Sequence, residues 1–460
     1  MNCLSRIIPA TFGQRLISFI TMPPSILRGM KAREVAYPIA GKKPKLVKDS
    51  KEAVSIIKSG SHIFVHGIAA TPTPLLEGLC EHAKANDLKK ITLHHMHLEG
   101  RVPWLAPDVK DRIRTADFNS IFLHEIPLLF RSGAIHLNAA LITVSPPDCN
   151  GFCTLGTGVE CTRAAVTLAD FIIAICNKNM PRTFGDALIH ESHIDFMVEN
   201  DFPLHEREFN GKTLETEKKI GELIANELVD NGATLQMGIG AVPDAALNAL
   251  CNHKNLGIHT EMFSDGVLKL VECNAITNTE KSIYPGKMVV SFVYGSKKLY
   301  SFLHDNPFVF FGDVAWVNDP SVVKTLPKMT AINSAVEVDL TGQVGSDSIG
   351  SRFLSGFGGQ VDFIRGAAIS VDGLGKPIIA LTSLTKKGQS KIVPYLRQGA
   401  GVVTSRAHIH YVVTEYGIAQ LWGKNMRQRA YELIRISHPN HRENLEKAAF
   451  KRLKVMPSLD

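Results

Sequence analysis

Glu261 is a carboxylate in the segment GIHTEMFSDG, residues 257–266, whose pattern could support covalent chemistry. The alternation of Ile258, Thr260 and Met262 predicts a strand whose carboxyl end presents His259 or Glu261. In α/β sheets this end of a strand faces the ligand crevice. A carboxylate there can act as a nucleophile, as a base or as a turn-capping acid, and the residues alone leave these roles open.

Closely spaced glycines form a second candidate in GIGAVPD, residues 238–244, between a predicted strand and a predicted helix. Such glycines let the backbone approach a ligand, and a helix N-terminus directs free N–H groups at phosphate. As a dinucleotide fingerprint the segment has Pro243 in place of the third glycine, and Glu261 lies about 20 residues on, where a ribose-binding acid would be. An NAD-dependent dehydrogenase is therefore an alternative from a different enzyme class.

Two further loops are rich in glycine. SGFGGQVDF, residues 355–363, leaves backbone donors that suit an oxyanion or a phosphate, although a tight structural loop would look the same. SPPDCNGFCTLGTG, residues 145–158, favours a substrate-lining loop over a nucleophilic cysteine, because no His or Lys lies nearby in sequence to lower a thiol pKa. His94, His95 and His97 offer two ligands on one strand face without a visible third, so no metal site is predicted.

The composition is that of a soluble globular protein. The 460 residues include 51 basic and 44 acidic side chains, and 45% of them are hydrophobic. No apolar run approaches the ~20 residues needed to cross a bilayer, and no basic stripe with interleaved aromatics favours nucleic acid. We therefore expect neither a membrane protein nor a nucleic-acid partner. The eight cysteines form no CxxC pair, so a disulfide scaffold is not expected either.

The positive charge is concentrated at the N-terminus. Glu34 is the first acidic residue, and the five basic residues before it account for five of the seven net charges. Apolar residues recur there at steps of three and four, with arginines off that face. This pattern is typical of a mitochondrial transit peptide over residues 1–35 and predicts the mitochondrial matrix, the alternative being an N-terminal docking arm.

Short apolar runs alternate with helical patterns along the rest of the chain, which indicates an α/β fold. We expect strands at residues 62–66, 91–95, 120–123, 140–144, 171–175, 234–237, 289–293, 367–370, 378–381 and 410–413, and helices at 74–85, 216–228, 244–253 and 427–435. A charged, turn-rich stretch at 199–219 divides a domain at 36–210 from one at 211–460.

An internal repeat relates the two domains. IIKSGSHIFVHGIAATPTPLLEGLCEHA and LVDNGATLQMGIGAVPDAALNALCNH both predict a helix, a glycine turn, a strand, a glycine-containing loop with proline and a second helix. We therefore expect two related open α/β domains with the active site between them.

Several motifs resemble the acetyl-CoA hydrolase/transferase family, in its branch of 4-hydroxybutyrate, butyrate:acetate and acetate:succinate CoA-transferases. They are HTEMFSDG, GIGAVPDAAL, NSAVEVDLTGQV, SGFGGQVDF, LTSLTKKG, TEYGIAQLWGK and ISHPNHREN, and the resemblance extends from about residue 43 to 449. It implies the family I CoA-transferase fold, with Glu261 as the nucleophile. It also implies CoA contacts at Gln236, Met237, Gly238, Ile239, Gly240, Ala335, Gly358 and Lys386, to which we add the backbone of Gly359, with Gly358, as the holder of oxyanions.

The resemblance implies an enzyme that moves CoA from acetyl-CoA to a carboxylic acid, succinate being the acceptor that a matrix address favours. The reaction would be ping-pong, through a glutamyl-CoA thioester on Glu261, with acyl-CoA and short acids as partners and no cofactor beyond CoA as co-substrate. A homodimer is implied as well. Acetyl-CoA hydrolysis and transfer to butyrate or 4-hydroxybutyrate are the alternatives within the family.

Overall fold

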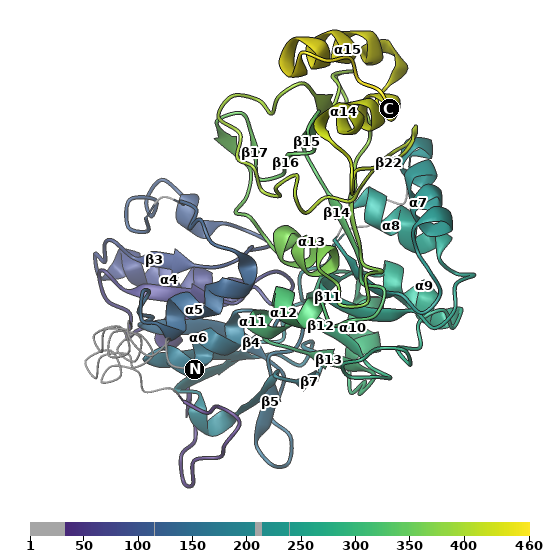
Figure 1. Ribbon diagram of the computed structural model, residues 1–460. Helices are drawn as coiled ribbons and strands as arrows, with labels where there is room; N and C mark the ends of the chain where they lie inside the picture. Colours follow the sequence, from purple (N-terminus) through teal and green to yellow (C-terminus); the bar gives the residue numbers. More distant parts are fainter. Residues whose placement is uncertain (1–32, 115, 208–213, 239) are drawn as a thin grey trace, which may run out of the picture.

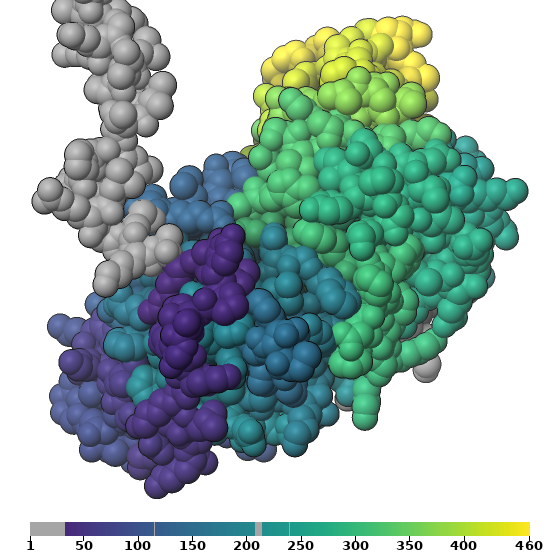
Figure 2. Space-filling view, turned by 90° about the horizontal axis from the view of Figure 1, so that it is seen from below, coloured from purple at the N-terminus to yellow at the C-terminus, as the bar shows by residue number. Residues whose placement is uncertain are grey.

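Figure 1 shows a computed structural model of the chain, which describes residues 33–114, 116–207, 214–238 and 240–460. All of the predicted transit peptide except residues 33–35 lies outside the described residues. The predicted junction near residue 210 also falls outside them, within 208–213. The described residues before 208, called the N-terminal half, and those from 214 onwards, called the C-terminal half, form two lobes that touch along one side (Figure 2).

A six-stranded sheet with all neighbours parallel forms the centre of the N-terminal half. Its strands, in spatial order, are β1 (Lys45–Leu46), β9 (Phe196–Glu199), β6 (Phe171–Cys176), β4 (Ala139–Val144), β2 (His62–Val65) and β3 (Thr92–His94). Every residue of β4 is buried, as expected for a strand covered on both faces.

A nine-stranded sheet forms the centre of the C-terminal half. Its strands, in spatial order, are β22 (Gly417–Gln420), β21 (Tyr411–Thr414), β19 (Lys376–Ala380), β14 (Thr330–Ser334), β10 (Thr234–Met237), β11 (Gly257–Phe263), β12 (Met288–Val293), β13 (Val309–Phe311) and β7 (Phe184–Gly185). Only the β21–β22 pair is antiparallel. The edge strand β7 belongs to the N-terminal half, so the two halves share this sheet.

Short sheets and helices complete the fold. The small sheets pair β5 (Phe152–Thr154) with β8 (Leu188–His190), β17 (Ser348–Ile349) with β18 (Arg352–Phe353), and β15 (Glu337–Asp339) with β16 (Val344–Gly345) and β20 (Ile392–Val393). The helices are α3 (Ser50–Ala53), α4 (Thr73–Ala85), α5 (Ile126–Arg131), α6 (Thr162–Leu168), α7 (Glu215–Glu227), α8 (Ala241–Ala249), α9 (Gly266–Glu272), α10 (Lys297–Leu303), α11 (Val314–Val317), α12 (Pro320–Val323), α13 (Gln360–Ala368), α14 (Met426–Arg435) and α15 (Pro439–Leu453). Three 3₁₀ turns are η1 (Pro103–Leu105), η2 (Leu123–Glu125) and η3 (Glu191–His193). None of the helices described is long and apolar enough to cross a bilayer.

The predicted α/β class is confirmed, but two predicted strands are wrong. Residues 120–123 lead into the 3₁₀ turn η2, and residues 367–370 contain the end of helix α13. In α13 the apolar residues Phe363, Ile364 and Ala367 lie on one buried helical face, so the run that looked like a strand is the end of an amphipathic helix. Short apolar runs do not distinguish these two cases by periodicity.

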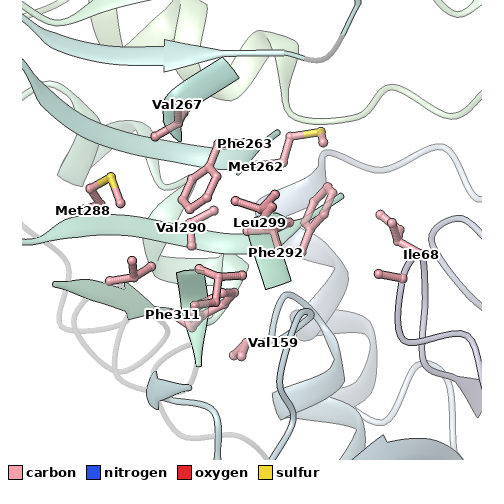
Figure 3. Packing of buried hydrophobic residues seen from close by; sticks show 14 of the residues in the cluster. Ile68, Val159, Met262, Phe263, Val267, Met288, Val290, Phe292, Leu299 and Phe311 are labelled. Atoms are coloured by element: carbon pink, nitrogen blue, oxygen red, sulfur yellow. The ribbon is translucent and has the colours of Figure 1, made fainter. Parts of the chain in front are cut away.

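One hydrophobic cluster crosses from the N-terminal half into the C-terminal half. It packs the inner strands β11 and β12 against α9, α10 and residues of the N-terminal half. Figure 3 shows part of it, with labelled members from both halves: Ile68, Val159, Met262, Phe263, Val267, Met288, Val290, Phe292, Leu299 and Phe311. Because Met262 and Phe263 are buried in this cluster, the carboxyl end of β11 is held firmly at the contact between the halves.

Candidate active site

The predicted site residues follow the carboxyl ends of neighbouring parallel strands in the nine-stranded sheet. Adjacent strands run in the order β19, β14, β10 and β11. The loop Gly238–Gly240 follows β10, Glu261 lies near the end of β11, Ala335 follows β14, and Lys386 lies beyond β19. The sheet order therefore places segments that are far apart in sequence along one edge, where parallel sheets present ligand sites.

Glu261 lies against a buried amide. Its Oε2 accepts a hydrogen bond of 2.8 Å from Nδ2 of Asn318, a fully buried residue directly after helix α11. Burial raises the pKa of Glu261 to about 7, the Asn318 hydrogen bond opposes this rise, and the negative charge of Asp362 adds to it. A carboxylate with this pKa is ionised in about half of the molecules near neutral pH, and it is less solvated than a free one.

Gly359 brings the glycine loop onto this carboxylate. A Cβ atom built on Gly359 would lie 1.8 Å from Oε2 of Glu261 and 2.4 Å from Nδ2 of Asn318. No side chain fits at that position, so its backbone is in direct contact with the carboxylate. Gly358 differs, because it is exposed, has φ of +63°, and has no heavy atom within 4 Å of a built Cβ. The structure therefore places Gly359 against the Glu261 carboxylate and Gly358 on the solvent side of the loop.

The loop after β10 starts from a buried side-chain pair. Gln236 accepts a hydrogen bond of 2.8 Å at its Oε1 from Nδ2 of Asn333 on β14, and both residues are buried. Gly240 precedes helix α8 with φ of +139°, a conformation that favours glycine. Gly238 is open, with no heavy atom within 4 Å of a built Cβ, and Ile239 lies outside the described residues. Gln236 thus supports the loop from the sheet, while the glycines leave space beside it.

Lys386 extends from the edge of the sheet. It is exposed in a turn closed by the hydrogen bond of 2.8 Å from the Thr385 N–H to the carbonyl of Gln389. No ion pair to its ammonium is present within the described residues. Lys386 can therefore meet an anionic ligand without breaking an internal contact, which is the property expected for a group that binds CoA phosphate.

Two protein-family models match this chain, one in each half. Residues 108–204 match the acetyl-CoA hydrolase/transferase N-terminal domain, and residues 295–449 match its C-terminal domain. The chain belongs to the acetyl-CoA hydrolase/transferase family. The predicted family is thereby confirmed.

Similar proteins agree with this assignment over nearly the whole length. The chain is 54% identical to a succinyl-CoA:acetate/propanoyl-CoA:succinate CoA transferase from Fasciola hepatica, over 93% of this chain and 92% of the relative. It is 45% identical to a 4-hydroxybutyrate coenzyme A transferase from Clostridium kluyveri, over 88% of this chain and 96% of that relative. The crystal structure of a 4-hydroxybutyrate CoA-transferase from Porphyromonas gingivalis superimposes with a TM-score of 0.79 at 37% identity, covering 88% of this chain and 97% of that one. These relatives confirm the predicted enzyme class, a CoA-transferase, and its predicted fold.

Three residues of this CoA-transferase site were not predicted from the sequence: Asn318, Asp362 and His124. Asp362 lies three residues after Gly359 in the quoted motif SGFGGQVDF, so its position in the chain was a usable signal. Asn318 and His124 stand in no motif that marks them, and only the packing of α11 and η2 brings them to Glu261 and Asp362.

The loop at 145–158 and the histidines at 94–97 are the remaining candidates for chemistry from the sequence of this CoA-transferase. Cys153 is fully buried, and burial raises the pKa of its thiol well above its usual range, which disfavours a thiolate. Within residues 33–460 as described, no group of three or more His, Cys, Asp or Glu could hold a metal ion. A cavity of about 390 Å³ beside α10, lined by residues such as Met180 and Tyr300, includes none of the predicted site residues.

Proposed function

We propose that this CoA-transferase moves CoA between acetyl-CoA and succinate through a glutamyl-CoA thioester on Glu261. The observation that carries the proposal is the half-enclosed Glu261 carboxylate, which has Asn318 on one oxygen and the Gly359 backbone beside it. The similar proteins named above are described as acting on succinyl, acetyl, propanoyl or 4-hydroxybutyryl groups, which supports short acyl substrates.

The first half-reaction would begin at Oε1 of Glu261, because Oε2 is held by Asn318. Oε1 attacks the carbonyl carbon of the acyl-CoA thioester, the carbon–sulfur bond breaks, and CoA leaves as the thiolate. The acyl group is then joined to Glu261 as a mixed anhydride. The thiolate attacks the Glu261 carbonyl carbon, the first acid leaves as a carboxylate, and a glutamyl-CoA thioester remains.

The second half-reaction is the reverse with a new acid. The incoming carboxylate attacks the glutamyl thioester, CoA leaves as the thiolate, and the thiolate then takes the new acyl group from the anhydride. Glu261 is regenerated as a carboxylate, and the bond changes balance without an oxidant or a reductant. The Asn318 N–H, together with the backbone of Gly359 beside it, is suited to the oxyanions that form on the way.

Trapping the thioester tests this proposal directly. Sodium borohydride reduces a glutamyl thioester, so we expect the wild-type enzyme to lose activity irreversibly when acetyl-CoA and borohydride are both present. Glu261→Gln should be inactive, with an unchanged melting temperature to show that it folds. Activity that survives borohydride would contradict the thioester, and changes in NADH absorbance would instead support the dehydrogenase alternative.

Kinetics with different acids test the substrates. Acetyl-CoA with succinate should give parallel double-reciprocal lines and a higher kcat/KM than butyrate or 4-hydroxybutyrate as acceptor. Release of CoA without any acceptor acid would favour the acetyl-CoA hydrolase alternative, in which water attacks the thioester.

We also propose that the enzyme works in the mitochondrial matrix as a homodimer. The support for the address is the basic, acid-free sequence before Glu34, and the support for the dimer is the resemblance to the family. A fluorescent protein fused to residues 1–35 should be imported by isolated mitochondria, and light scattering should give twice the chain mass. A fusion that stays outside, or a monomer, would overturn the respective statement.

A further inference from the structure

His124 and Asp362 form a contact between the two halves next to the nucleophile. His124 lies in η2 of the N-terminal half, and Asp362 lies in the first turn of α13. Nδ1 of His124 is 2.9 Å from Oδ1 of Asp362, and the His124 backbone N–H donates to Oδ2 over 3.2 Å. The side chain of Asp362 is 1% exposed and that of His124 22%. Asp362 therefore receives two hydrogen bonds from the opposite half while it is enclosed by protein.

Asp362 also contacts the amide that holds Glu261. Nδ2 of Asn318 lies 3.4 Å from Oδ2 of Asp362 and 2.8 Å from Oε2 of Glu261. The two N–H bonds of this one amide therefore point at two carboxylates. A flipped amide would turn its oxygen toward both negative charges, so Asp362 and Glu261 together fix the orientation of Asn318. The result is a continuous chain of contacts from His124 through Asp362 and Asn318 to Glu261.

The chain of contacts joins two carboxylates to one side chain that can carry a positive charge. The negative charge of Asp362 raises the pKa of Glu261 and so opposes the ionised form that attacks the thioester. In the described part of the molecule, His124 is the group able to carry positive charge that is hydrogen-bonded to either carboxylate. The hydrogen bond to Asp362 raises the pKa of His124, burial opposes this rise, and the negative charges of Asp362, Glu125 and Asp319 add to it.

Aromatic contacts hold the His124 segment against the glycine loop. The ring of Phe122 lies parallel to that of His124, with centroids 6.4 Å apart, and 5.9 Å from the ring of Phe357. The ring centroids of Phe118 and Phe353 lie 6.1 Å apart, with the rings tilted against each other. The contacts of Phe122 with Phe357 and of Phe118 with Phe353 join the N-terminal half to the region just before Gly359. They hold the segment that contains His124 next to α13.

We propose that His124 is a positioning residue, supplied by the N-terminal half, whose charge balances Asp362 so that Asn318 stays oriented and Glu261 can ionise. The inference rests on the proposed function of Glu261 as the nucleophile. It means that the site on the C-terminal half is electrostatically complete only when the N-terminal half is docked on it.

The pH dependence of kcat/KM tests the inference, because its acid limb reports the ionisation of the free enzyme. His124→Ala removes the charge and the hydrogen bond, and we expect the acid limb to move up by about one pH unit. His124→Asn keeps a donor near the position of Nδ1 without a charge, so it should show the same shift with a smaller loss of plateau activity. Asp362→Asn added to His124→Ala removes the charge that His124 balances, and the limb should return to the wild-type position or below it.

His136 provides a matched control. Its Nε2 lies 2.9 Å from Oδ2 of Asp170 in an exposed pair on the same half. His136→Ala should leave the pH profile unchanged. If His124→Asn folds with a wild-type melting temperature and lowers activity by one factor at every pH, His124 is only structural and the inference is wrong. If wild type itself is not inactivated by borohydride with acetyl-CoA, the proposed function has failed instead, so the two failures are distinguishable.

Discussion

Glu261 and Glu160 are carboxylates from opposite halves of the molecule that are both enclosed where the halves meet. Burial raises the pKa of Glu261 to about 7 and that of Glu160 to about 8. Oε1 of Glu160 accepts a hydrogen bond of 2.9 Å from the Thr162 hydroxyl, and Oε2 has no hydrogen-bond partner among the residues described. The backbone of Glu160 bonds to Ser291 and Val314 of the C-terminal half. By these measures the two carboxylates look alike.

They differ in access and in the groups that face them. Glu160 is 2% exposed and lies in the turn that leads into α6. Glu261 is partly exposed at the edge of the sheet, with an amide donor and a glycine backbone beside it. A raised pKa marks both groups, so it does not identify the nucleophile by itself. Room for an acyl group and donors for the developing charge are the features that separate them.

Replacing Gly359 is expected to lower activity more than replacing Asn318 or Glu160, because its backbone lies beside Glu261 and not beside Glu160. In Gly359→Ala the new methyl group would overlap Glu261 and Asn318, so the carboxylate must move, and we expect kcat/KM to fall at least about 100-fold. Gly358→Ala is the matched control, since open space surrounds its Cβ and only the left-handed backbone is strained, by about 1–2 kcal/mol. Equal losses in the two variants, at unchanged melting temperatures, would contradict the close contact at Gly359.

Asn318 is the next test, because Glu160 has no equivalent of this amide donor. Asn318→Ala should lower kcat about ten- to a hundredfold with little change in KM, since one donor to the reacting carboxylate is lost. Asn318→Asp should be worse than Asn318→Ala, because it places a third negative charge between Glu261 and Asp362. Steady-state kinetics of both variants at one pH check the order, and an aspartate variant more active than the alanine variant would refute it.

The glutamate and its strand could be predicted from the sequence because local pattern determines both. The strand at 234–237 has the predicted bounds, and Glu261 lies on the predicted strand among the alternating residues of GIHTEMF. The surroundings of the carboxylate could not be predicted in this way. Asn318 reaches Glu261 only because α11 packs beside β11, and Asp362 only because α13 follows the glycine loop back over the sheet. The contacts of Asp362 with Asn318 and His124 join residues 44 and 238 positions apart. The local periodicity of the sequence carries no information on contacts at such separations.

The acid limb of kcat/KM should lie near pH 7 in the wild-type enzyme. In the proposed mechanism only the ionised carboxylate attacks. Burial raises the pKa of Glu261 to about 7, so activity should rise with pH through that value and then level off. A pH profile with saturating acceptor acid measures this. A limb near the ordinary value of about 4.5 would mean that Glu261 is better solvated than its surroundings indicate.

Glu160→Gln is expected to have the smallest effect on catalysis, within about twofold in kcat/KM, since Glu160 lies outside the reacting contacts. Its effect should appear in stability. The pKa of Glu160 is about 8 in the folded chain and about 4.5 when unfolded, so the folded wild type binds a proton that the unfolded chain lacks. Wild-type stability therefore falls as pH rises through this window, and the glutamine variant lacks that fall. Urea unfolding at about pH 5 and about pH 8 should show the variant gaining roughly 1–3 kcal/mol on wild type over the interval. A large loss of activity in Glu160→Gln would instead mean that both enclosed carboxylates take part in transfer.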